Sequence, residues 1–337
     1  MDPAGTLRFG ILGAAKIAPM ALVQPARDVA GVAVVAVAAR EPERARAFAA
    51  KHGIACAAAD YEALLAMPEV DVVYNALPTA LHARWTLRAL RAGKHVLCEK
   101  PFASNAREAE QMVAEAETAG RRLVEAFHWR YHPVAARILA ICGGGELGRI
   151  VRLEARFSAP IRDRSDIRWD LALGGGASMD LGCYPVHWCR TVMGSEPEVV
   201  AAKAREGPPR VDVEMEAELR FPRDARAGGA PVPARVHCSM DGDAPFEATL
   251  DVIGSEGALH VRNPLAPQLG HRIELRRGGE TRAETAPGRS TYHHQLEAVA
   301  RALREGAPLP TGGADAIANL RVLDGVYRAS GLGPRGE

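Results

Sequence analysis

Two different spacings of apolar residues divide the chain near residue 128. Before that point, short and continuously apolar segments alternate with longer stretches in which apolar residues recur at helical spacing. The apolar segments predict buried strands over 7–12, 32–38, 70–76, 95–98 and 122–126. The stretches between them predict helices over 42–52, 79–92 and 104–119. Strands that alternate with helices indicate a doubly wound parallel sheet, whose ligands bind at the carboxyl ends of the strands.

After Trp129 apolar and polar residues alternate strictly. The alternation predicts strands over 151–157, 212–221, 235–240 and 248–252. Such strands form an antiparallel sheet with one packed face and one solvated face, on which opposite charges can pair across strands. We expect a helix over 177–193 to cover the packed face, a loop over 223–233, and late helices over 292–304 and 315–330. We also expect a homodimer through the charged face.

Composition and charge narrow the class of protein. The chain has 337 residues, which is too many for one core, and its net charge of +1 favours neither nucleic acid nor a membrane surface as a partner. No apolar run is long enough to span a bilayer, and the N-terminus lacks a signal-peptide core. Six scattered cysteines without a CxxC pair predict reduced thiols in a cytoplasmic protein. The histidines show no metal-binding spacing, so we expect no metal site.

The strand at 7–12 runs into a turn of small residues that is typical of dinucleotide binding. The turn reads Gly13, Ala14, Ala15, Lys16, Ile17, Ala18, a G-x-G-x-x-G pattern with alanine at its second and third glycine positions. The first glycine permits the tight turn, the second position admits a pyrophosphate, and the third lets the helix pack on its strand. We therefore expect an α/β protein with a dinucleotide-binding Rossmann domain over 5–128. A second α/β domain with an open, predominantly antiparallel sheet should follow over 129–337.

The end of the second strand bears on the choice between NADP and NAD. An NAD site usually has an acidic residue there, which binds the ribose 2′-hydroxyl. This chain has Ala38 and Ala39 followed by Arg40, which leaves room for a 2′-phosphate and supplies a guanidinium to bind it. We therefore expect NADP in preference to NAD. The alternative is that Arg40 lies on the surface at a helix start and that Glu41 binds the ribose.

Several further polar or small residues follow directly after predicted strands, so they should line one crevice with the glycine turn. The candidate cofactor-binding residues there are Leu77, Pro78, Thr79, His82, Glu99, Lys100 and Pro101, and His128 follows the last strand. Only five of the 42 lysines and arginines are lysines. A lysine that remains in such a chain is a candidate for a role that arginine cannot fill, which draws attention to Lys100. The alternative for Glu99 and Lys100 is an ordinary surface ion pair.

A second cluster of candidate residues lies on the helix predicted after the glycine run at 174–176. Asp180, Tyr184 and His187 are spaced so that they share one helix face, while apolar residues occupy another. A carboxylate, a phenol and an imidazole on one face can support proton transfer. The alternatives are a solvated polar face or, for Asp180, an ion pair or a helix-start role. Neighbouring residues that could form a pocket wall are Arg130, His132, Arg162, Asp163, Arg168 and Trp169.

These motifs together resemble the Gfo/Idh/MocA family of oxidoreductases over nearly the whole chain. The resemblance rests on the turn at 13–18, on E-K-P at 99–101, on AFHWRYHP at 126–133 and on IRWDLALGGGASMDLGCYP at 167–185. It is greatest with the branch that includes glucose-fructose oxidoreductase, xylose dehydrogenases, dihydrodiol dehydrogenases and nucleotide-sugar 3-ketoreductases. The resemblance implies that Lys100 and Tyr184 lie beside the nicotinamide and that the Lys100–Pro101 bond is cis.

The resemblance implies an NAD(P)-dependent dehydrogenase or reductase. It would transfer a hydride between the nicotinamide and a secondary hydroxyl or ketone of a sugar, a sugar derivative or a cyclic diol. We expect Tyr184 to act as the acid/base, Lys100 to lower its pKa, and Asp180 to hold a neighbouring hydroxyl. Candidate substrate contacts are His128, Arg130, Arg168, Trp169 and His187. The alternatives are a redox-neutral enzyme that retains its nicotinamide and a non-catalytic dinucleotide-binding sensor.

Overall fold

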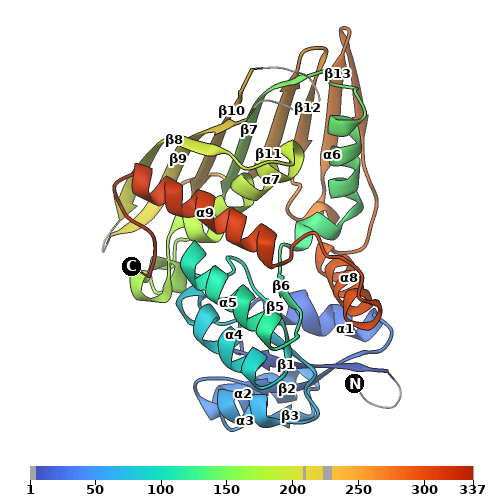
Figure 1. The fold of residues 1–337 in the computed structure, drawn as a ribbon, viewed down its shortest axis with the longest axis vertical. Coiled ribbons are helices and arrows are strands. Elements are labelled where there is room, and N and C mark those ends of the chain that lie inside the picture. The colour runs from blue at the N-terminus through green and yellow to red at the C-terminus, as the bar shows by residue number, and fades with distance from the viewer. Residues whose placement is uncertain (1–4, 208–209, 223–229, 337) are drawn as a thin grey trace. The chain divides into compact units, whose positions relative to one another are not determined.

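The computed structural model describes residues 5–207, 210–222 and 230–336, and it divides the chain into two compact units (Figure 1). The first unit comprises the chain up to Ala103 together with Arg107–Arg130 and Tyr292–Ile317. The second unit comprises Ser104–Ala106, Tyr131–Thr291 and the chain from Ala318 onward. Each unit therefore contains segments that are distant in sequence.

The first unit is built on a sheet in which all strands are parallel. Its strands run in the order β3-β2-β1-β4-β5-β6, so the chain reverses its direction of winding between β1 and β4. The strands are β1 Leu7–Leu12, β2 Val32–Ala38, β3 Cys56–Ala57, β4 Val72–Asn75, β5 His95–Cys98 and β6 Leu123–Glu125. This confirms the predicted doubly wound sheet. In such a sheet the ligand site lies at the carboxyl ends of the strands beside the reversal.

Three helices agree with predicted ones: α2 Pro42–His52 has the predicted bounds, and α4 His82–Arg91 and α5 Ala106–Thr118 are shorter than predicted. Helix α1, Gln24–Asp28, follows the glycine turn, and α3, Tyr61–Ala66, lies in a segment for which no helix was predicted. Short turns of other helical types precede α1 over Pro19–Val23 and α4 over Thr79–Leu81. The predicted helix over 79–92 therefore begins as a 3₁₀ turn directly after Pro78.

A late helix, α8 (Thr291–Glu305), packs on the parallel sheet. Its residues Leu296 and Val299 are buried in one cluster with Phe9 and Val72 of the strands. This segment was expected in the second domain, 129–337, but Tyr292–Ile317 belong to the first unit. The apolar residues of α8 supply part of the cover that the parallel sheet needs on its faces.

The second unit contains an eight-stranded mixed sheet in the order β14-β13-β12-β11-β7-β10-β9-β8. The strands are β7 Ile150–Ser158, β8 Glu198–Gly207, β9 Val211–Phe221, β10 Val232–Ser239, β11 Glu247–Gly254, β12 Gly257–Arg262, β13 Arg272–Arg277 and β14 Glu280–Glu284. All paired neighbours are antiparallel except β7 and β10, which are parallel. The sheet is thus predominantly antiparallel, as expected.

Strands β7, β9, β10 and β11 agree with predicted strands, whereas the other four strands of this sheet were not predicted. Strands β8, β13 and β14 carry so many exposed or charged residues that their alternation is obscured. The loop predicted over 223–233 ends too late, since Val232 and Pro233 already belong to β10; residues 223–229 of that loop lie outside the described part of the chain.

Helices cover one face of the second sheet. The second unit contains α6 (Pro133–Gly143), α7 (Cys183–Met193) and most of α9 (Gly313–Ala329). Helix α7 packs against β7 and β10, which confirms the predicted cover (Figure 1). The first turn of the predicted helix over 177–193 is a π-helical turn, Ser178–Gly182, that leads into α7. Within the described residues, no helix has the length and apolar character needed to cross a membrane.

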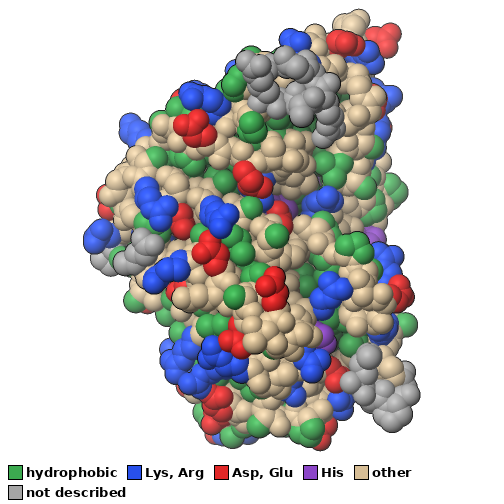
Figure 2. All heavy atoms as spheres, in the orientation of Figure 1, with side chains coloured by type: hydrophobic (Ala, Val, Ile, Leu, Met, Phe, Trp, Pro, Cys, Tyr) green, Lys and Arg blue, Asp and Glu red, His purple; other side chains and the backbone are tan. Residues whose placement is uncertain are grey.

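The opposite face of this sheet carries charged side chains that pair across strands. Arg205 of β8 bonds Glu214 of β9 at 3.0 Å, and Arg235 of β10 lies 3.3 Å from Glu216. The predicted cross-strand pairing is therefore confirmed. Basic and acidic side chains also intermingle over the surface drawn in Figure 2. All six cysteines are free thiols, and four of them are buried.

Candidate active site

The glycine turn of the first unit has the geometry that a dinucleotide requires. Gly13 follows β1 directly and has a φ of +95°, a conformation that favours glycine. A Cβ on Gly13 would lie only 3.1 Å from the carbonyl oxygen of Ala76, so a side chain would crowd the loop after β4. Its amide donates to the Ala38 carbonyl at 2.8 Å. Further along the turn, Ala15 and Ile17 are half-buried and Lys16 is exposed. The turn therefore fits a bound pyrophosphate.

Arg40, the candidate for binding a 2′-phosphate, and Glu41, the alternative candidate for binding the ribose, lie together after the end of β2. The Arg40 side chain is 81% exposed and its Nε donates to Glu41 Oε1 at 2.6 Å. This hydrogen bond raises the pKa of Arg40 and lowers that of Glu41. Arg44, which the sequence analysis missed, also bonds Glu41 and reaches the Ala14 carbonyl at 3.5 Å. Its position four residues after Arg40, on α2, is the signal that could have identified it.

The loop after β4 is held by buried polar contacts around His82. The His82 ring lies between the carbonyl oxygens of Leu77, at 2.7 Å from Nε2, and Pro101, at 2.9 Å from Nδ1. Burial lowers the pKa of His82, while the two carbonyl oxygens oppose this shift. A ring nitrogen that carries a proton donates to the carbonyl oxygen beside it. Asn75 adds a bond from Nδ2 to the His82 carbonyl at 3.2 Å. His82 thus joins two loops of the candidate cofactor edge, while Pro78 and Thr79 are half-buried beside it.

The E-K-P segment after β5 is anchored by a buried tyrosine. Tyr74 of β4 is fully buried and donates from Oη to Glu99 Oε1 at 2.5 Å. The Lys100 amide donates to the other carboxylate oxygen of Glu99 at 3.3 Å, and the Lys100–Pro101 bond is cis, as the resemblance implied. Glu99 is only 8% exposed, so the alternative of a surface ion pair is wrong for its side chain. Burial and the Glu99 charge raise the pKa of Tyr74 well above its usual value.

His128 completes this edge of the first unit as a neutral ring. It is buried and packs on Tyr292, with ring centroids 4.1 Å apart. Burial and the positive charge of Lys100 lower the pKa of His128 to about 3. Arg130 is half-buried in the same 3₁₀ turn, His128–Tyr131. The structure therefore brings Tyr74, Glu99 and Lys100 together and places the Lys100 charge within electrostatic reach of His128.

In the second unit, Asp180 is part of an ion-pair cluster. Arg168 donates from Nε to Asp180 Oδ2 at 2.6 Å and from Nη1 to Asp166 Oδ1 at 3.1 Å. The two carboxylates raise the pKa of Arg168. Asp180 is therefore an ion-pair partner, as the alternative had it. The half-exposed guanidinium of Arg168 lies between two carboxylates, and this cluster offers both donors and acceptors to hydroxyl groups.

Trp169 is buried directly beside this cluster. Its Nε1 donates to the Ile161 carbonyl at 3.1 Å, and the Arg164 guanidinium lies 3.7 Å from its ring centroid. The indole is therefore held by a hydrogen bond to the backbone and by a cation–π contact.

Tyr184 and His187 are both buried on α7. Tyr184 is 3% exposed, and its ring meets Phe157 edge-to-face at a centroid distance of 5.6 Å. His187 is 1% exposed. Because Asp180 belongs to the π-helical turn, the regular α-helical spacing assumed for Asp180 and Tyr184 does not hold. The wider turn changes the angle between these two side chains around the helix axis.

A dinucleotide-type parallel sheet, followed by a mixed sheet whose covering helix α7 carries the buried Tyr184, indicates a nucleotide-dependent oxidoreductase. Residues 7–127 match the model of the GFO/IDH/MocA oxidoreductase family, NAD-binding Rossmann fold, and residues 135–260 match the GFO/IDH/MocA C-terminal domain. The chain belongs to the GFO/IDH/MocA family. The family resemblance inferred from the motifs is confirmed.

Similar proteins cover almost the whole chain. A dTDP-3,4-didehydro-2,6-dideoxy-alpha-D-glucose 3-reductase from Streptomyces violaceoruber is 36% identical over 97% of this chain and 96% of its own. A D-xylose 1-dehydrogenase (NADP(+)) from Haloferax volcanii is 34% identical, covering 97% of this chain and 98% of its own. The crystal structure of a 3-ketoreductase from Actinomadura kijaniata in complex with NADP and TDP-benzene superimposes with a TM-score of 0.87. It is 29% identical and covers 96% of this chain and 98% of its own. The chain is therefore similar to dehydrogenases and reductases throughout.

Proposed function

We propose that the protein is an NADP-dependent oxidoreductase that interconverts a secondary hydroxyl and a ketone on a sugar or sugar derivative. The observation that carries the proposal is the buried Tyr74–Glu99 bond beside Lys100, at the edge of a nucleotide-binding sheet. Glu99 accepts from the Lys100 amide and thereby holds the backbone of a residue whose ammonium can assist proton transfer. When bound, the nicotinamide supplies the chemistry of hydride transfer.

The residues of the first unit fit the cofactor. The turn at Gly13, with Ala15, Lys16 and Ile17, would hold the pyrophosphate, because its backbone can approach closely and its helix offers free N–H groups. Arg40 would hold the 2′-phosphate, because its exposed guanidinium lies at the end of β2. Leu77, Pro78, Thr79, Glu99 and Pro101 would line the remaining edge, and His82 would fix its two loops.

Tyr184 and Lys100 would perform the proton transfer. Oxidation of a hydroxyl needs a group that takes its proton, and a free phenol has a pKa of about 10. A neighbouring ammonium favours the phenolate and lowers this pKa. Lys100 would therefore enable Tyr184 to take the proton from the substrate oxygen near neutral pH, and in the reverse direction to return it. Lys100 would also donate to the substrate oxygen.

The proposed substrate class rests on the relatives and on the Asp180–Arg168 pair. The relatives named above act on D-xylose and on a dTDP-linked keto sugar. A carboxylate and a guanidinium held 2.6 Å apart offer both an acceptor and donors to the neighbouring hydroxyls of such a substrate. His128, Arg130, Trp169 and His187 remain the proposed walls of this site.

A substrate screen tests the proposal. The purified protein would be incubated with NADP⁺ or NAD⁺ and with D-xylose, D-glucose or an aromatic dihydrodiol, and reduced cofactor would be followed by absorbance. We expect turnover with an aldose and a preference for NADP⁺. Reduced-nicotinamide absorbance before any addition would instead indicate the redox-neutral alternative, and cofactor binding without turnover on any of these compounds would favour the sensor.

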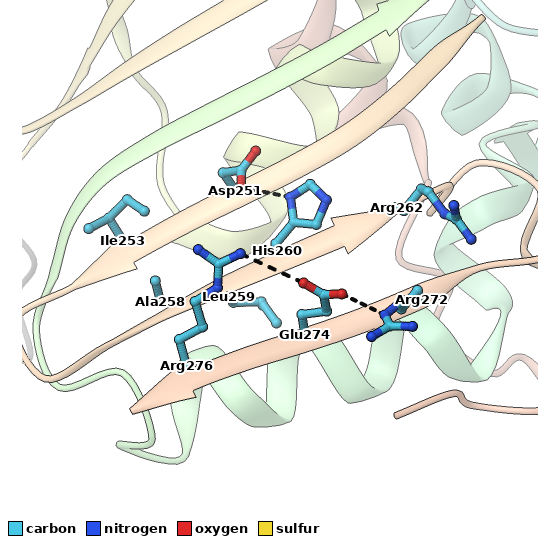
Figure 3. A pocket seen from close by; sticks show the side chains of 9 residues that line it. All are labelled: Asp251, Ile253, Ala258, Leu259, His260, Arg262, Arg272, Glu274 and Arg276. Carbon is cyan, nitrogen blue, oxygen red and sulfur yellow. Dashed lines mark hydrogen bonds and ion pairs between the residues drawn. The ribbon is translucent and has the colours of Figure 1, made fainter. Parts of the chain in front are cut away.

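We also propose a homodimer through the open face of the second sheet. Strands β11, β12 and β13 form a hollow of about 320 Å³ there (Figure 3). Its floor carries opposite charges in alternation, with His260 bonded to Asp251 at 2.8 Å and Arg272 bonded to Glu274 at 2.5 Å. A face with both signs interspersed can be complementary to its own copy across a two-fold axis.

Light scattering after size-exclusion chromatography tests the dimer. Glu274→Lys should convert it to a monomer, because the reversed charge would meet basic side chains of both copies. Glu117→Lys, on the exposed side of α5, is the matched control and should leave the mass unchanged. A monomeric mass for the unmodified protein would contradict the proposal.

A further inference from the structure

A fully buried carboxylate contacts the N-terminal end of the helical segment that bears Asp180 and Tyr184. Asp212 of β9 has no exposed surface. Its Oδ2 accepts from the Ser178 amide at 2.7 Å, and its Oδ1 accepts from Tyr327 Oη at 3.0 Å and from Arg335 Nη2 at 2.5 Å. The Ser178 amide is one of the unpaired donors at the start of a helix, so Asp212 caps that helix from a neighbouring strand.

Arg335 balances this charge and extends the contact to the glycine run. The Arg335 residue is 5% exposed, and its Nε donates to the Gly175 carbonyl at 3.2 Å. Its guanidinium lies 4.4 Å from the ring centroid of Tyr327. The Arg335 carbonyl accepts from Asn105 Nδ2 at 2.8 Å, which fixes the backbone of the segment after α9.

The glycine run is packed closely against this pair. Gly176 has a φ of +139°, and a Cβ there would overlap the Asp212 carboxylate. A Cβ on Gly175 would lie 2.5 Å from the Arg168 carbonyl oxygen. The run is therefore packed between the Arg168 backbone on one side and the Asp212–Arg335 pair on the other, and Asp180 and Tyr184 follow within ten residues.

We propose that Asp212 and Arg335 are positioning residues that set the location of the π-helical turn and α7, and thereby of Asp180 and Tyr184. The proposal rests on the proposed function for its effect on turnover. Neither residue touches the reacting atoms. Asp212 acts through the Ser178 amide, and Arg335 acts through the Gly175 carbonyl and through the charge of Asp212.

The alternative is that the pair only stabilises the fold. A buried ion pair often adds little net stability, but the loss of one partner is costly because the other charge remains buried. Replacement of both partners by neutral groups removes that cost. A variant in which both residues are replaced therefore separates an effect on stability from an effect on the position of α7.

The pair also predicts a pH signature. The groups that face Asp212 are Arg335, Tyr327 and Ser178, with the Cys238 thiol of β10 close by. Burial raises the pKa of Asp212, and Arg335 opposes that rise. Without Arg335 the pKa of Asp212 in the folded state would rise further above its unfolded value. The folded state would then hold the proton longer, so stability would fall as pH rises from the unfolded pKa through the folded one.

The experiment compares Arg335→Met, Asp212→Asn, the double variant, Arg335→Lys and Arg301→Met, an exposed control on α8. We expect Arg335→Met to lower kcat by about tenfold to a hundredfold, the size expected for a small misplacement of reacting groups, with NADP affinity unchanged. Its melting temperature should fall as pH rises. Arg335→Lys should recover part of kcat, and Arg301→Met should match the unmodified protein.

The double variant should have the melting temperature of the unmodified protein and should lack the pH dependence expected of Arg335→Met. Its kcat should stay low, because the Gly175 carbonyl has lost the Arg335 donor. Recovery of kcat together with stability, or unchanged kcat in Arg335→Met, would overturn the proposal. Amide hydrogen exchange of peptide 174–187 gives a readout without any substrate, and it should accelerate in both Arg335→Met and the double variant. If exchange accelerates as expected but Tyr184→Phe retains full turnover, the positioning role of the pair is supported and the proposed function is wrong. Unchanged exchange rates would contradict the positioning role.

Discussion

The candidate groups of the two units are held by opposite means. In the first unit, Gly13, Arg40 and Lys100 lie within two residues of the ends of strands, so the backbone of the parallel sheet places them. In the second unit, Asp180 and Tyr184 stand on a helix whose start is held by side chains from elsewhere in the sequence. Groups at strand ends should therefore respond to local substitutions, whereas the helix should respond to substitutions at distant positions.

Each unit also contains a buried tyrosine that donates to a buried carboxylate. Tyr74 bonds Glu99 at 2.5 Å, and Tyr327 bonds Asp212 at 3.0 Å. The bonds are chemically alike, but Glu99 is the neighbour of Lys100, while Asp212 acts on the backbone of a helix. The same deletion of a hydroxyl should thus have different functional consequences in the two units.

The largest effects should come from the groups proposed to act on the substrate. Lys100→Ala and Tyr184→Phe should each reduce turnover by about a hundredfold to ten-thousandfold, the contribution expected of acid–base catalysis. Cofactor affinity should remain near that of the unmodified protein in steady-state and binding measurements. Turnover at the original rate in either variant would remove that residue from the mechanism.

A smaller loss should follow removal of the guanidinium at the end of β2. Arg40→Ala should weaken NADP binding by about tenfold or more and leave NAD binding nearly unchanged, because only NADP carries the 2′-phosphate. Titration of each cofactor by protein fluorescence gives the ratio. Arg46→Ala, an exposed arginine on α2 that pairs with Glu43, is the control. Equal losses for both cofactors would mean that Arg40 does not discriminate between them.

The two tyrosine pairs sharpen the comparison further. Tyr74→Phe and Tyr327→Phe should each destabilise the protein by about 1–3 kcal/mol, because each leaves a buried carboxylate short of a donor. Only Tyr74→Phe should shift the pH profile of kcat/KM, since Glu99 is next to Lys100 in the chain. Denaturant titration and pH-rate profiles of both variants provide the measurement. Identical shifts in both variants would mean that the effect has no connection with Lys100.

The smallest expected effect concerns the neutral ring of His128. Its pKa is about 3 in the folded state, below the ordinary value of about 6.5. A depressed histidine pKa means that the unfolded state takes up a proton first, so stability falls as pH drops from about 6.5 towards 3. His128→Gln should reduce this acid sensitivity in denaturant titrations between pH 7 and pH 4.5. An unchanged slope would show that His128 does not contribute to it.

The sequence predicts the first unit better than the second for a physical reason. Strands that are buried on both faces, such as Val32–Ala38, leave an uninterrupted apolar signal. Strand β13, Arg272–Arg277, lies in an open sheet and carries mostly charged residues, so its apolar periodicity is weak. The π-helical turn at Ser178–Gly182 has no local sequence signal that distinguishes it from an ordinary helical start.

The candidate site shows the same difference. Glu99 and Lys100 are found because they follow a buried strand in a recognisable motif. Tyr74 is missed because a tyrosine within a continuously apolar strand looks like an ordinary core residue. Asp212 is missed because a polar residue in an alternating strand looks like a residue of the solvated face until its burial is known. Arg335 is missed because the partner that gives it a role is more than a hundred residues away in the sequence.

The pH dependence of kcat/KM for substrate oxidation, measured for the unmodified protein and for Lys100→Ala, tests the central claim most directly. If an ammonium eases proton removal by a phenol, the ionisation that activates the unmodified protein should lie well below about 10, and in the variant it should move up towards that value. Superimposable profiles, with the activating ionisation at the same pH in both proteins, would contradict the account.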